Sequence, residues 1–445
     1  MLIVLLSACG NNMKNDDSQM KQFALMTPDP GHFHAALVQK NMYEEVSPLA
    51  YVFGPEGDEL DQHLDRIEAY NHRNDNPTAW EENVYTGSDF FEHMLESRPG
   101  NVVILAGNNS KKTDYIIESL RSGLNVLADK PMVITPEKFP VLEEAFRVAD
   151  ENNVLLYDIM TERYEITTML QKALSQNISI FGELETGSAE QAAVTKESVH
   201  HFFKYVSGEP VQRPGWYFDT RQQGEGIVDV TTHLVDLIQW ECYPEVILSK
   251  DDIEIIRASR WPTVLSLEDF QEVTGLDDFP GYLEKDIIDG DLHVYANGEI
   301  VYKIKDTYAR VLVEWKYRAD EGAGDTHHSI MRGSRSNLVI RQGEGEGYEP
   351  VLYAELNEPV DGFEEMLAGA ISELPWDGIT YKKLDDTIYM FNIPGKYRVG
   401  HEAHFGQVME KYLDYLKKGD MPEWEVPNMI SKYYTTTEAL KKALE

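Results

Sequence analysis

The first third of the chain alternates between short apolar runs and longer segments whose apolar residues recur every three or four positions. The runs predict strands at 22–26, 49–53, 101–106, 125–128 and 154–157, and the longer segments predict helices at 33–43, 89–95, 112–122 and 136–152. Strands that alternate with helices indicate βαβ units, because parallel strands need a crossover connection. We therefore predict an α/β domain with a parallel sheet over residues 21–158, with a polar, helix-containing insertion at 56–80.

The second half has a different pattern. A helix is expected at 166–176, a strand at 182–186, alternating strand patterns at 291–295, 299–303, 308–315, 328–331 and 337–341, and further helices at 401–418 and 433–444. Alternation of apolar and polar residues is typical of an antiparallel sheet with one open face. Asn297-Gly298 predicts a hairpin turn between the first two strands of this series. Residues 159–445 are thus predicted to form an α+β domain with an open, mainly antiparallel sheet.

One segment of this half combines apolar and ionisable positions at helical spacing. Asp229, His233 and Asp236 fall on one narrow stripe of a helix, together with Trp240, when each residue turns by 100°. The opposite side carries Ile227, Val230, Leu234, Leu237 and Ile238, and we expect this side to pack. The polar stripe can then line a pocket, or it can be an ordinary solvated face.

Length and charge narrow the class of protein. A chain of 445 residues is long enough for two domains with separate cores. The net charge of −37 argues against binding of nucleic acid or of an anionic membrane surface, since both would repel the protein.

The two cysteines exclude a disulfide framework, and one of them has an unusual setting. Leu6-Ser7-Ala8-Cys9 ends an apolar run and resembles the lipobox of bacterial lipoproteins, although a positively charged start is missing. We predict that residues 1–20 are a signal remnant and tether. Lipidated Cys9 would then anchor an exported protein on the periplasmic side of a membrane or at the cell surface. The alternative is a frayed apolar terminus.

Five short motifs follow one another along the chain. They are Val-Ile-Leu-Ala-Gly-Asn-Asn at 103–109, Asp129-Lys130-Pro131, Trp216-Tyr-Phe-Asp219 with Gly224-Glu-Gly226, Asp229-x-x-x-His233-x-x-Asp236, and Ile330-Met-Arg-Gly333 with Leu-Val-Ile at 338–340. Together they resemble the Gfo/Idh/MocA oxidoreductases, which are named after glucose–fructose oxidoreductase and inositol dehydrogenase. The hallmark of that family at the second motif is Glu-Lys-Pro.

The resemblance implies a Rossmann-like first domain that binds NAD or NADP and a second domain that binds a carbohydrate. It implies catalytic roles for Lys130, Asp229 and His233, and contacts to substrate from Trp216, Asp236 and His401. The cofactor contacts that it implies come from Gly31, His32, Phe33, Asn108, Asn109, Asp129, Lys130 and Pro131. These residue types suit the reaction, since an imidazole can accept the hydroxyl proton while a lysine stabilises the developing alkoxide.

The turn after the first strand departs from the family pattern. A dinucleotide fold usually has G-x-G-x-x-G there, so that the backbone can approach a diphosphate. Here the turn is Pro-Asp-Pro-Gly-His-Phe-His at 28–34, in which only Gly31 remains and Asp29 and His34 take the other glycine positions. His32 and His34 could offset the charge of Asp29 or serve another ligand. The acid that binds the ribose would be Glu56 or Asp58, which favours NAD over NADP.

Three histidine pairs raise the question of a metal, namely His200-His201, His327-His328, and His401 with His404. None has the His-Glu-x-x-His spacing of a zinc motif, and we expect no metal site.

Two classes of function remain open. The first is an NAD(P)-dependent oxidoreductase for a secondary hydroxyl of a sugar, glycoside or polyol, with tightly bound cofactor that is recycled internally. The second is a carbohydrate-binding lipoprotein, or a non-redox glycoside-processing enzyme, that has lost dinucleotide binding. By analogy with the family, we expect a homo-oligomer that associates through the open sheet.

Overall fold

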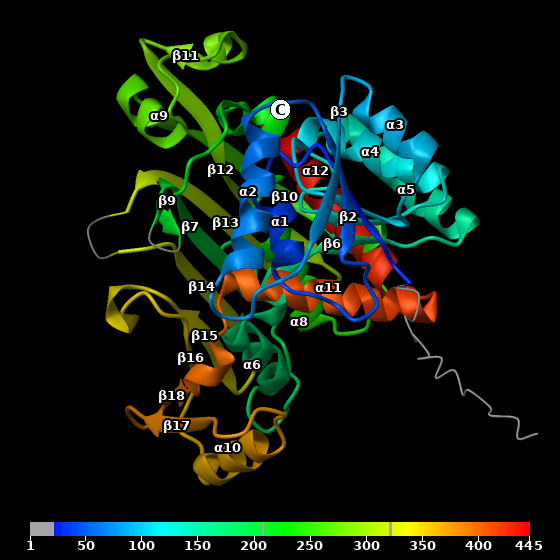
Figure 1. The fold of residues 1–445 in the computed structure, drawn as a ribbon. Helices are drawn as coiled ribbons and strands as arrows, with labels where there is room; N and C mark the ends of the chain where they lie inside the picture. Colours follow the sequence, from blue (N-terminus) through cyan, green and yellow to red (C-terminus); the bar gives the residue numbers. More distant parts are fainter. Residues whose placement is uncertain (1–21, 207–208, 320–322) are drawn as a thin grey trace, which may run out of the picture.

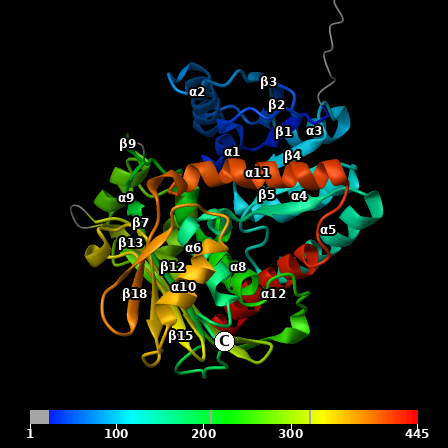
Figure 2. The ribbon, with the colours of Figure 1, turned by 90° about the horizontal axis from the view of Figure 1, so that it is seen from below.

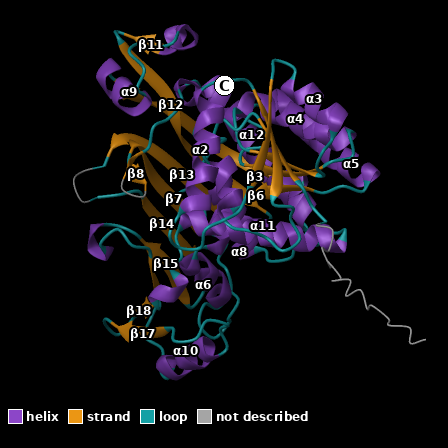
Figure 3. Cartoon of the chain, viewed as in Figure 1, coloured by secondary structure: helices purple, strands orange, loops and turns teal. Residues whose placement is uncertain are grey.

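The computed structural model describes residues 22–206, 209–319 and 323–445, which form two large sheets and one short strand pair, with helices around and between them (Figure 1). The predicted lipobox with Cys9 lies outside these residues. Figure 3 shows the larger sheet on one side of the molecule and the smaller sheet, enclosed by helices, on the other. No helix among the described residues is long and apolar enough to span a bilayer.

The first sheet has six parallel strands in the order β3-β2-β1-β4-β5-β6. The strands are β1 (Leu25–Pro28), β2 (Leu49–Gly54), β3 (Glu81–Thr86), β4 (Val102–Leu105), β5 (Asn125–Asp129) and β6 (Leu156–Ile159), and the helices between them are α1 (His34–Leu37), α2 (Asp58–His72), α3 (Phe90–Ser97), α4 (Asn109–Arg121) and α5 (Phe139–Asn152). This strand order is that of a dinucleotide-binding fold, and the predicted α/β class is confirmed. Edge strand β3 is missing from the sequence prediction because its residues are mostly polar and exposed.

The second sheet has ten strands, of which nine run in the order β10-β12-β13-β7-β14-β15-β16-β18-β17, while β11 pairs with β12. They are β7 (Val194–Phe203), β10 (Ile253–Leu265), β11 (Ile287–Ile288), β12 (Asp291–Ile304), β13 (Thr307–Arg318), β14 (Thr326–Arg332), β15 (Ser336–Arg341), β16 (Val351–Leu356), β17 (Thr380–Lys383) and β18 (Ile388–Asn392), with the short pair β8 (Tyr205–Val206) and β9 (Glu209–Pro210) beside them. Only β7 and β13 pair in parallel, so the sheet is mainly antiparallel, as predicted.

The remaining helices are α6 (Ile166–Ser175), α7 (Thr220–Gln223), α8 (Thr231–Cys242), α9 (Leu267–Thr274), α10 (Phe363–Ser372), α11 (His401–Lys418) and α12 (Glu425–Leu444). The core of the large sheet includes apolar residues of α6 and α8. The core of the parallel sheet includes apolar residues of α11 and α12, although both helices follow the large sheet in sequence. Figure 2 shows α11 crossing beside the parallel sheet and α12 running obliquely away from it.

The predicted hairpin at Asn297-Gly298 is wrong, because β12 runs straight through both residues. The Asn297 side chain instead accepts a hydrogen bond from the backbone of Trp315 and donates to the carbonyl of Trp261, where β10 has an irregular register. A Cβ atom at position 298 would clash with Ile227, so this glycine permits a neighbouring segment to approach β12 closely.

Other strand assignments also differ from the sequence pattern, which does not predict β10, β11, β16, β17 or β18. The predicted strand 182–186 forms only an isolated bridge, from Leu184 to Gly333. The strand β7, between β13 and β14, carries polar residues that mask its apolar alternation.

Candidate active site

A cavity of about 710 Å³ lies between the two sheets, at the carboxyl ends of β1, β4 and β5. Residues from the turn after β1, from the ends of β4 and β5, from α8 and from the start of α11 line it. In open α/β sheets this edge is where ligands bind. Among the residues in the predicted site, those that line the cavity are His32, Phe33, Asn109, Asp129, Lys130, Asp229, His233 and His401.

Lys130 and Asp229 form an ion pair inside the cavity, with 2.5 Å between Nζ and Oδ1. Their side chains are only 11% and 6% exposed. Gln223 Nε2 donates to the second carboxylate oxygen of Asp229 at 3.1 Å. The carboxylate is therefore fixed from two sides, and the ammonium group is held at a defined point of the cavity wall.

Asp229 lies in the turn before α8 rather than on the helix that the sequence predicts, since α8 begins at Thr231. The turn is attached to β12, because Gly226 N donates to the carbonyl of Tyr295 at 3.1 Å. A Cβ atom at Gly226 would clash with Ala296 on the same strand. The glycines at 226 and 298 thus let the turn lie directly on β12, which sets the position of Asp229.

His233 occupies the first turn of α8 and lines the cavity. Its Nδ1 atom is buried and has no hydrogen-bond partner among the described residues. Burial, with a contribution from the charge of Lys130, lowers the pKa of His233 well below its usual value. The ring is therefore neutral at neutral pH and can accept a proton. Val230, Leu234 and Leu237, expected on the packing side, also line the cavity.

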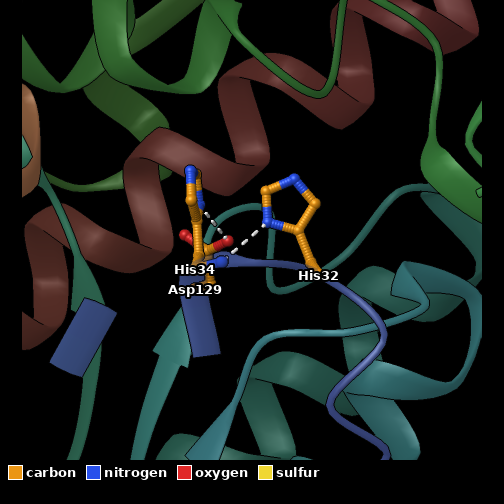
Figure 4. Close-up of side chains that lie close together, drawn as sticks. All are labelled: His32, His34 and Asp129. Atoms are coloured by element: carbon orange, nitrogen blue, oxygen red, sulfur yellow. Dashed lines mark hydrogen bonds and ion pairs between the residues drawn. The ribbon is translucent and has the colours of Figure 1, made fainter. Parts of the chain in front are cut away.

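The turn after β1 places two imidazoles against Asp129 at the end of β5 (Figure 4). His34 Nδ1 lies 2.9 Å from Asp129 Oδ2, and His32 Nδ1 accepts from the backbone N–H of His34 at 3.3 Å. Burial lowers the pKa of both histidines well below the usual value, so both rings are neutral. Gly107 at the end of β4 is required here, since a Cβ atom would clash with the carbonyl of Asp29.

Gly31, the one glycine of the expected fingerprint, is covered by a side chain from α2. A Cβ atom on Gly31 would clash with the carboxylate of Glu59. Trp216 Nε1 donates to the other oxygen of this carboxylate at 2.6 Å. The hollow that remains beside Gly31 is only about 20 Å³.

Because it binds Glu59, Trp216 does not lie where the sequence predicts it. The residue is buried and does not line the large cavity, where we predicted a contact to substrate. Its neighbour Tyr217 lines the cavity in its place.

Asp236 likewise does not line the cavity. Both of its oxygens accept hydrogen bonds from Arg163 at 2.7 Å, and Lys432 on α12 donates to one of them at 2.8 Å. These contacts lower the pKa of the Asp236 carboxyl, although burial opposes the shift. In the structure Asp236 ties α8 to α12 and has no free oxygen for a substrate.

Two residues of the predicted cofactor site make hydrogen bonds within the protein. Asn108 caps α4 by accepting from Ser110 N at 3.0 Å, and it does not line the cavity. Asn109 does line it, and donates to the carbonyl of Gln223 at 2.7 Å. Pro131 follows Lys130 through a cis peptide bond.

His401 begins α11 and faces the cavity, with its ring 5.8 Å from that of His34. Glu162, on the short helix Thr161–Tyr164, lies beside it, with 3.9 Å between His401 Nε2 and Glu162 Oε1. Burial raises the pKa of Glu162 to about 7. A carboxyl group that titrates near neutrality in a cavity is a candidate acid or base, and sequence reasoning missed it.

The large sheet and the loops beside its strands contribute further polar residues that the sequence did not single out for this site. They are Ser198, His200, Lys204, Arg213, Asp325, Thr326 and His327. Lys204 Nζ donates to Asp325 at 2.9 Å, so this wall also contains a charge pair. Of these residues, only His200 and His327 stood out in the sequence, as members of histidine pairs. The others gave no local signal, because segments far apart in the chain bring them together.

Comparisons with known proteins agree with this architecture. Residues 170–444 match the family model described as "Putative oxidoreductase C terminal domain". A crystal structure of a "putative oxidoreductase" from Parabacteroides merdae is 54% identical, covers 95% of this chain and 98% of its own, and has a TM-score of 0.93. No curated protein sequence matches the chain.

More distant structures share the fold. Myo-inositol 2-dehydrogenase from Lactobacillus plantarum is 14% identical over 95% of this chain and 98% of its own, with a TM-score of 0.55. Levoglucosan dehydrogenase in complex with NADH and levoglucosan is 11% identical over 95% of this chain and 97% of its own, with a TM-score of 0.60.

Proposed function

Since the chain belongs to the oxidoreductase family that this C-terminal domain defines, we propose that it oxidises a secondary hydroxyl group of a sugar, glycoside or polyol, or reduces the corresponding ketone, with a nicotinamide dinucleotide. The observation that carries the proposal is the group formed by Lys130, Asp229 and His233, which lies in one cavity at the carboxyl edge of a sheet of dinucleotide-binding order. The inositol and levoglucosan dehydrogenases of similar fold suggest the substrate class.

The three side chains can divide the proton chemistry between them. His233 is neutral because burial lowers its pKa, so one of its ring nitrogens is free to accept the proton of the substrate hydroxyl. Lys130 can donate a hydrogen bond to the same oxygen and stabilise its developing negative charge. Asp229 holds the ammonium group in place. A nicotinamide ring, when bound, would supply the hydride acceptor or donor.

The cavity fits the reacting end of such a complex, since 710 Å³ is within the range of small-molecule sites. The turn where the diphosphate of the dinucleotide would bind is more restricted. Gly31 N and His32 N already donate to the carbonyls of Asp29 and Ala106, and the Glu59 carboxylate covers Gly31. A diphosphate at this turn therefore requires Glu59 to move. The acids Glu56 and Asp58 flank the start of α2, which favours NAD over NADP by repulsion of a ribose phosphate.

The closed turn supports the second candidate, a carbohydrate-binding protein without a dinucleotide. The two candidates differ in one measurement. Freshly purified protein is denatured, and the released nucleotide is identified by mass spectrometry and quantified by absorbance. We expect close to one equivalent of NAD(H) or NADP(H), as tight, internally recycled cofactor requires. If no nucleotide is released and added NAD and NADP do not bind, the oxidoreductase proposal fails and the binding protein is favoured.

We also propose that Cys9 carries a lipid and anchors an exported protein on the periplasmic side of a membrane or at the cell surface. Association through the open face of the large sheet is a further part of this proposal. Mass spectrometry of the N-terminal peptide tests the first point, since an acylated Cys9 would be the mature N-terminus. Sedimentation of the purified protein tests the second, and a monomer at micromolar concentration would contradict it.

A further inference from the structure

Histidines are concentrated in the central cavity. Six of the thirteen histidines of the chain line it, namely His32, His34, His200, His233, His327 and His401. The proposed hydride transfer needs one of them as a base. Two of the others, His32 and His34, lie beside Asp129, and the three residues each offer a ligand atom within 4.8 Å of the other two (Figure 4).

We propose that His32, His34 and Asp129 bind one divalent transition-metal ion whose remaining coordination positions open into the cavity. Two imidazoles and one carboxylate are a common donor set for Zn²⁺ and for Fe²⁺ or Mn²⁺, and three protein ligands leave positions for water or substrate. Ligands that lie about 2.1 Å from a metal are roughly 3–3.5 Å from one another, so small side-chain rotations bring this set to coordination distance.

Two of the three side chains already face each other, and the third faces the backbone of the turn that carries them. His34 Nδ1 shares a hydrogen bond with Asp129 Oδ2, and His32 Nδ1 presents its lone pair to the backbone N–H of His34. A lone pair that accepts a hydrogen bond can equally bind a metal ion. The ion would take the place of the proton between His34 and Asp129 and would replace the long contact at His32.

The surroundings hold the ligands in place. The His34 ring packs against Phe405 at 4.6 Å between centroids, and the His32 ring stacks on Tyr217 at 6.4 Å. Buried Lys112 donates to the backbone carbonyl of Asp129 at 2.9 Å. These contacts orient the ligands, while the charge of Lys112 beside His34 opposes binding of a cation. The charge of nearby Lys130 is balanced by Asp229, which limits its repulsion of a cation.

An ion at this place would contact what the cavity holds. A water or a substrate hydroxyl in an open coordination position becomes more acidic, and a pair of adjacent hydroxyls can occupy two positions. The site therefore suits an oxygen-rich ligand such as a sugar. It does not depend on the proposed hydride transfer, because the metal can bind the protein alone.

The spacing of the histidine pairs along the chain does not indicate this metal site. The histidine pairs that attracted attention are neighbours or lie three apart, whereas this set combines two alternate residues of one turn with Asp129, 95 positions away from His34. Only the pairing of β4 with both β1 and β5 brings the turn to Asp129.

The test is metal binding by the full-length purified protein. After treatment with a chelator and its removal, Zn²⁺ and Mn²⁺ are titrated by calorimetry, and bound metal is counted by elemental mass spectrometry. We expect one equivalent of one of these ions. His32→Ala and His34→Ala should each weaken binding by at least about 100-fold, since even the loss of a supporting residue costs 10- to 100-fold. Asp129→Asn retains the side-chain size and should also weaken it.

Two controls keep the result interpretable. His72→Ala removes an exposed histidine that lies 3.3 Å from Glu68 and can bind metal adventitiously, and it should leave the affinity unchanged. Each variant is also melted with chelator and with metal, because a folded variant that lacks the site loses only the metal-induced rise in Tm.

Co²⁺ should give visible absorption bands of nitrogen and oxygen ligation in the parent protein alone. The proposal would be overturned if the parent protein binds no metal, or if His32→Ala and His34→Ala bind it as tightly as the parent does, whatever nucleotide the protein contains.

Discussion

The ammonium group of Lys130 and the carboxylate of Asp229 lie 2.5 Å apart, although 99 positions separate them in the chain. Lys130 follows the end of a parallel strand, and Asp229 lies in a turn that rests on the large sheet. The pair therefore joins the two sheets at the point where the proposed reaction takes place. Its strength and its geometry depend on both sheets being in place.

Lys130→Met and Asp229→Asn should each reduce turnover by at least about 100-fold and also destabilise the protein, because each leaves one buried charge without its partner. Steady-state rates and urea unfolding measure the two effects. In a double-mutant cycle we expect a coupling free energy of about 1–3 kcal/mol. Lys138→Met, which removes an exposed pair with Asp114, is the matched control and should change little. Additive effects of Lys130 and Asp229 would show that the pair does not act as a unit.

His233→Ala should leave the protein folded and any bound nucleotide in place, while turnover falls by at least about 100-fold, the usual cost of a lost general base. His233→Asn keeps a polar side chain at the site and should be equally impaired, since an amide does not accept the proton. Rates and nucleotide content are measured on the same preparations. Turnover close to that of the parent in either variant would remove His233 from the mechanism.

Glu59 and Trp216 form a contact that covers Gly31, and we expect this contact to oppose dinucleotide binding. Glu59→Gln removes a negative charge from the face where a diphosphate would lie, so the affinity for NAD should rise by about tenfold. Trp216→Phe removes the hydrogen-bond donor and should act in the same direction. Calorimetric titration of nucleotide-free protein measures both. Weaker binding in Glu59→Gln would instead assign the carboxylate to the cofactor, for example to a ribose hydroxyl.

Glu162 should make the stability of the protein depend on pH. Burial raises its pKa in the folded protein to about 7 from an ordinary value of 4.5. The folded state therefore binds a proton that the unfolded chain releases, and stability falls as the pH rises from about 4.5 to 7. Glu162→Gln cannot ionise and should escape this loss. About a third of the Glu162 side chain is accessible from the cavity, and solvent therefore weakens the effect. Relative to the parent, we expect Glu162→Gln to gain only about 1 kcal/mol in free energy of unfolding between pH 5 and pH 8.

Urea unfolding of the parent and of Glu162→Gln at pH 5, 6, 7 and 8 checks this dependence. Glu96→Gln, an exposed residue on α3, is the control for a general effect of net charge. A stability difference that is the same at all four pH values would contradict the raised pKa.

The sequence predicts much of this architecture because its signals are local. Apolar runs and the motif around Lys130 identify the parallel sheet and its reactive edge, and alternation identifies the class of the second sheet. Asp236 shows that local periodicity is not enough to identify a substrate contact. It shares a helical stripe with His233, but its carboxylate accepts hydrogen bonds from Arg163 and Lys432, which lie far away in the sequence. Gly298 is a similar case, because an Asn-Gly pair usually marks a turn, whereas here it permits close packing.

Lys432 is the residue in which this long-range organisation can be tested most directly. Its side chain is fully buried on α12, and Nζ lies 2.6 Å from Asp158 at the end of the parallel sheet and 2.8 Å from Asp236 on α8. Lys432→Met should destabilise the protein by about 3–5 kcal/mol, because both carboxylates lose a partner that they cannot replace with water. Turnover should fall as well, since α8 carries His233. Lys441→Met on the exposed side of the same helix removes a pair with Glu438 and should change the free energy of unfolding by less than about 0.5 kcal/mol. Equal stabilities of the two variants would mean that the buried carboxylates are neutralised by other groups, and that α8 is positioned by its apolar contacts alone.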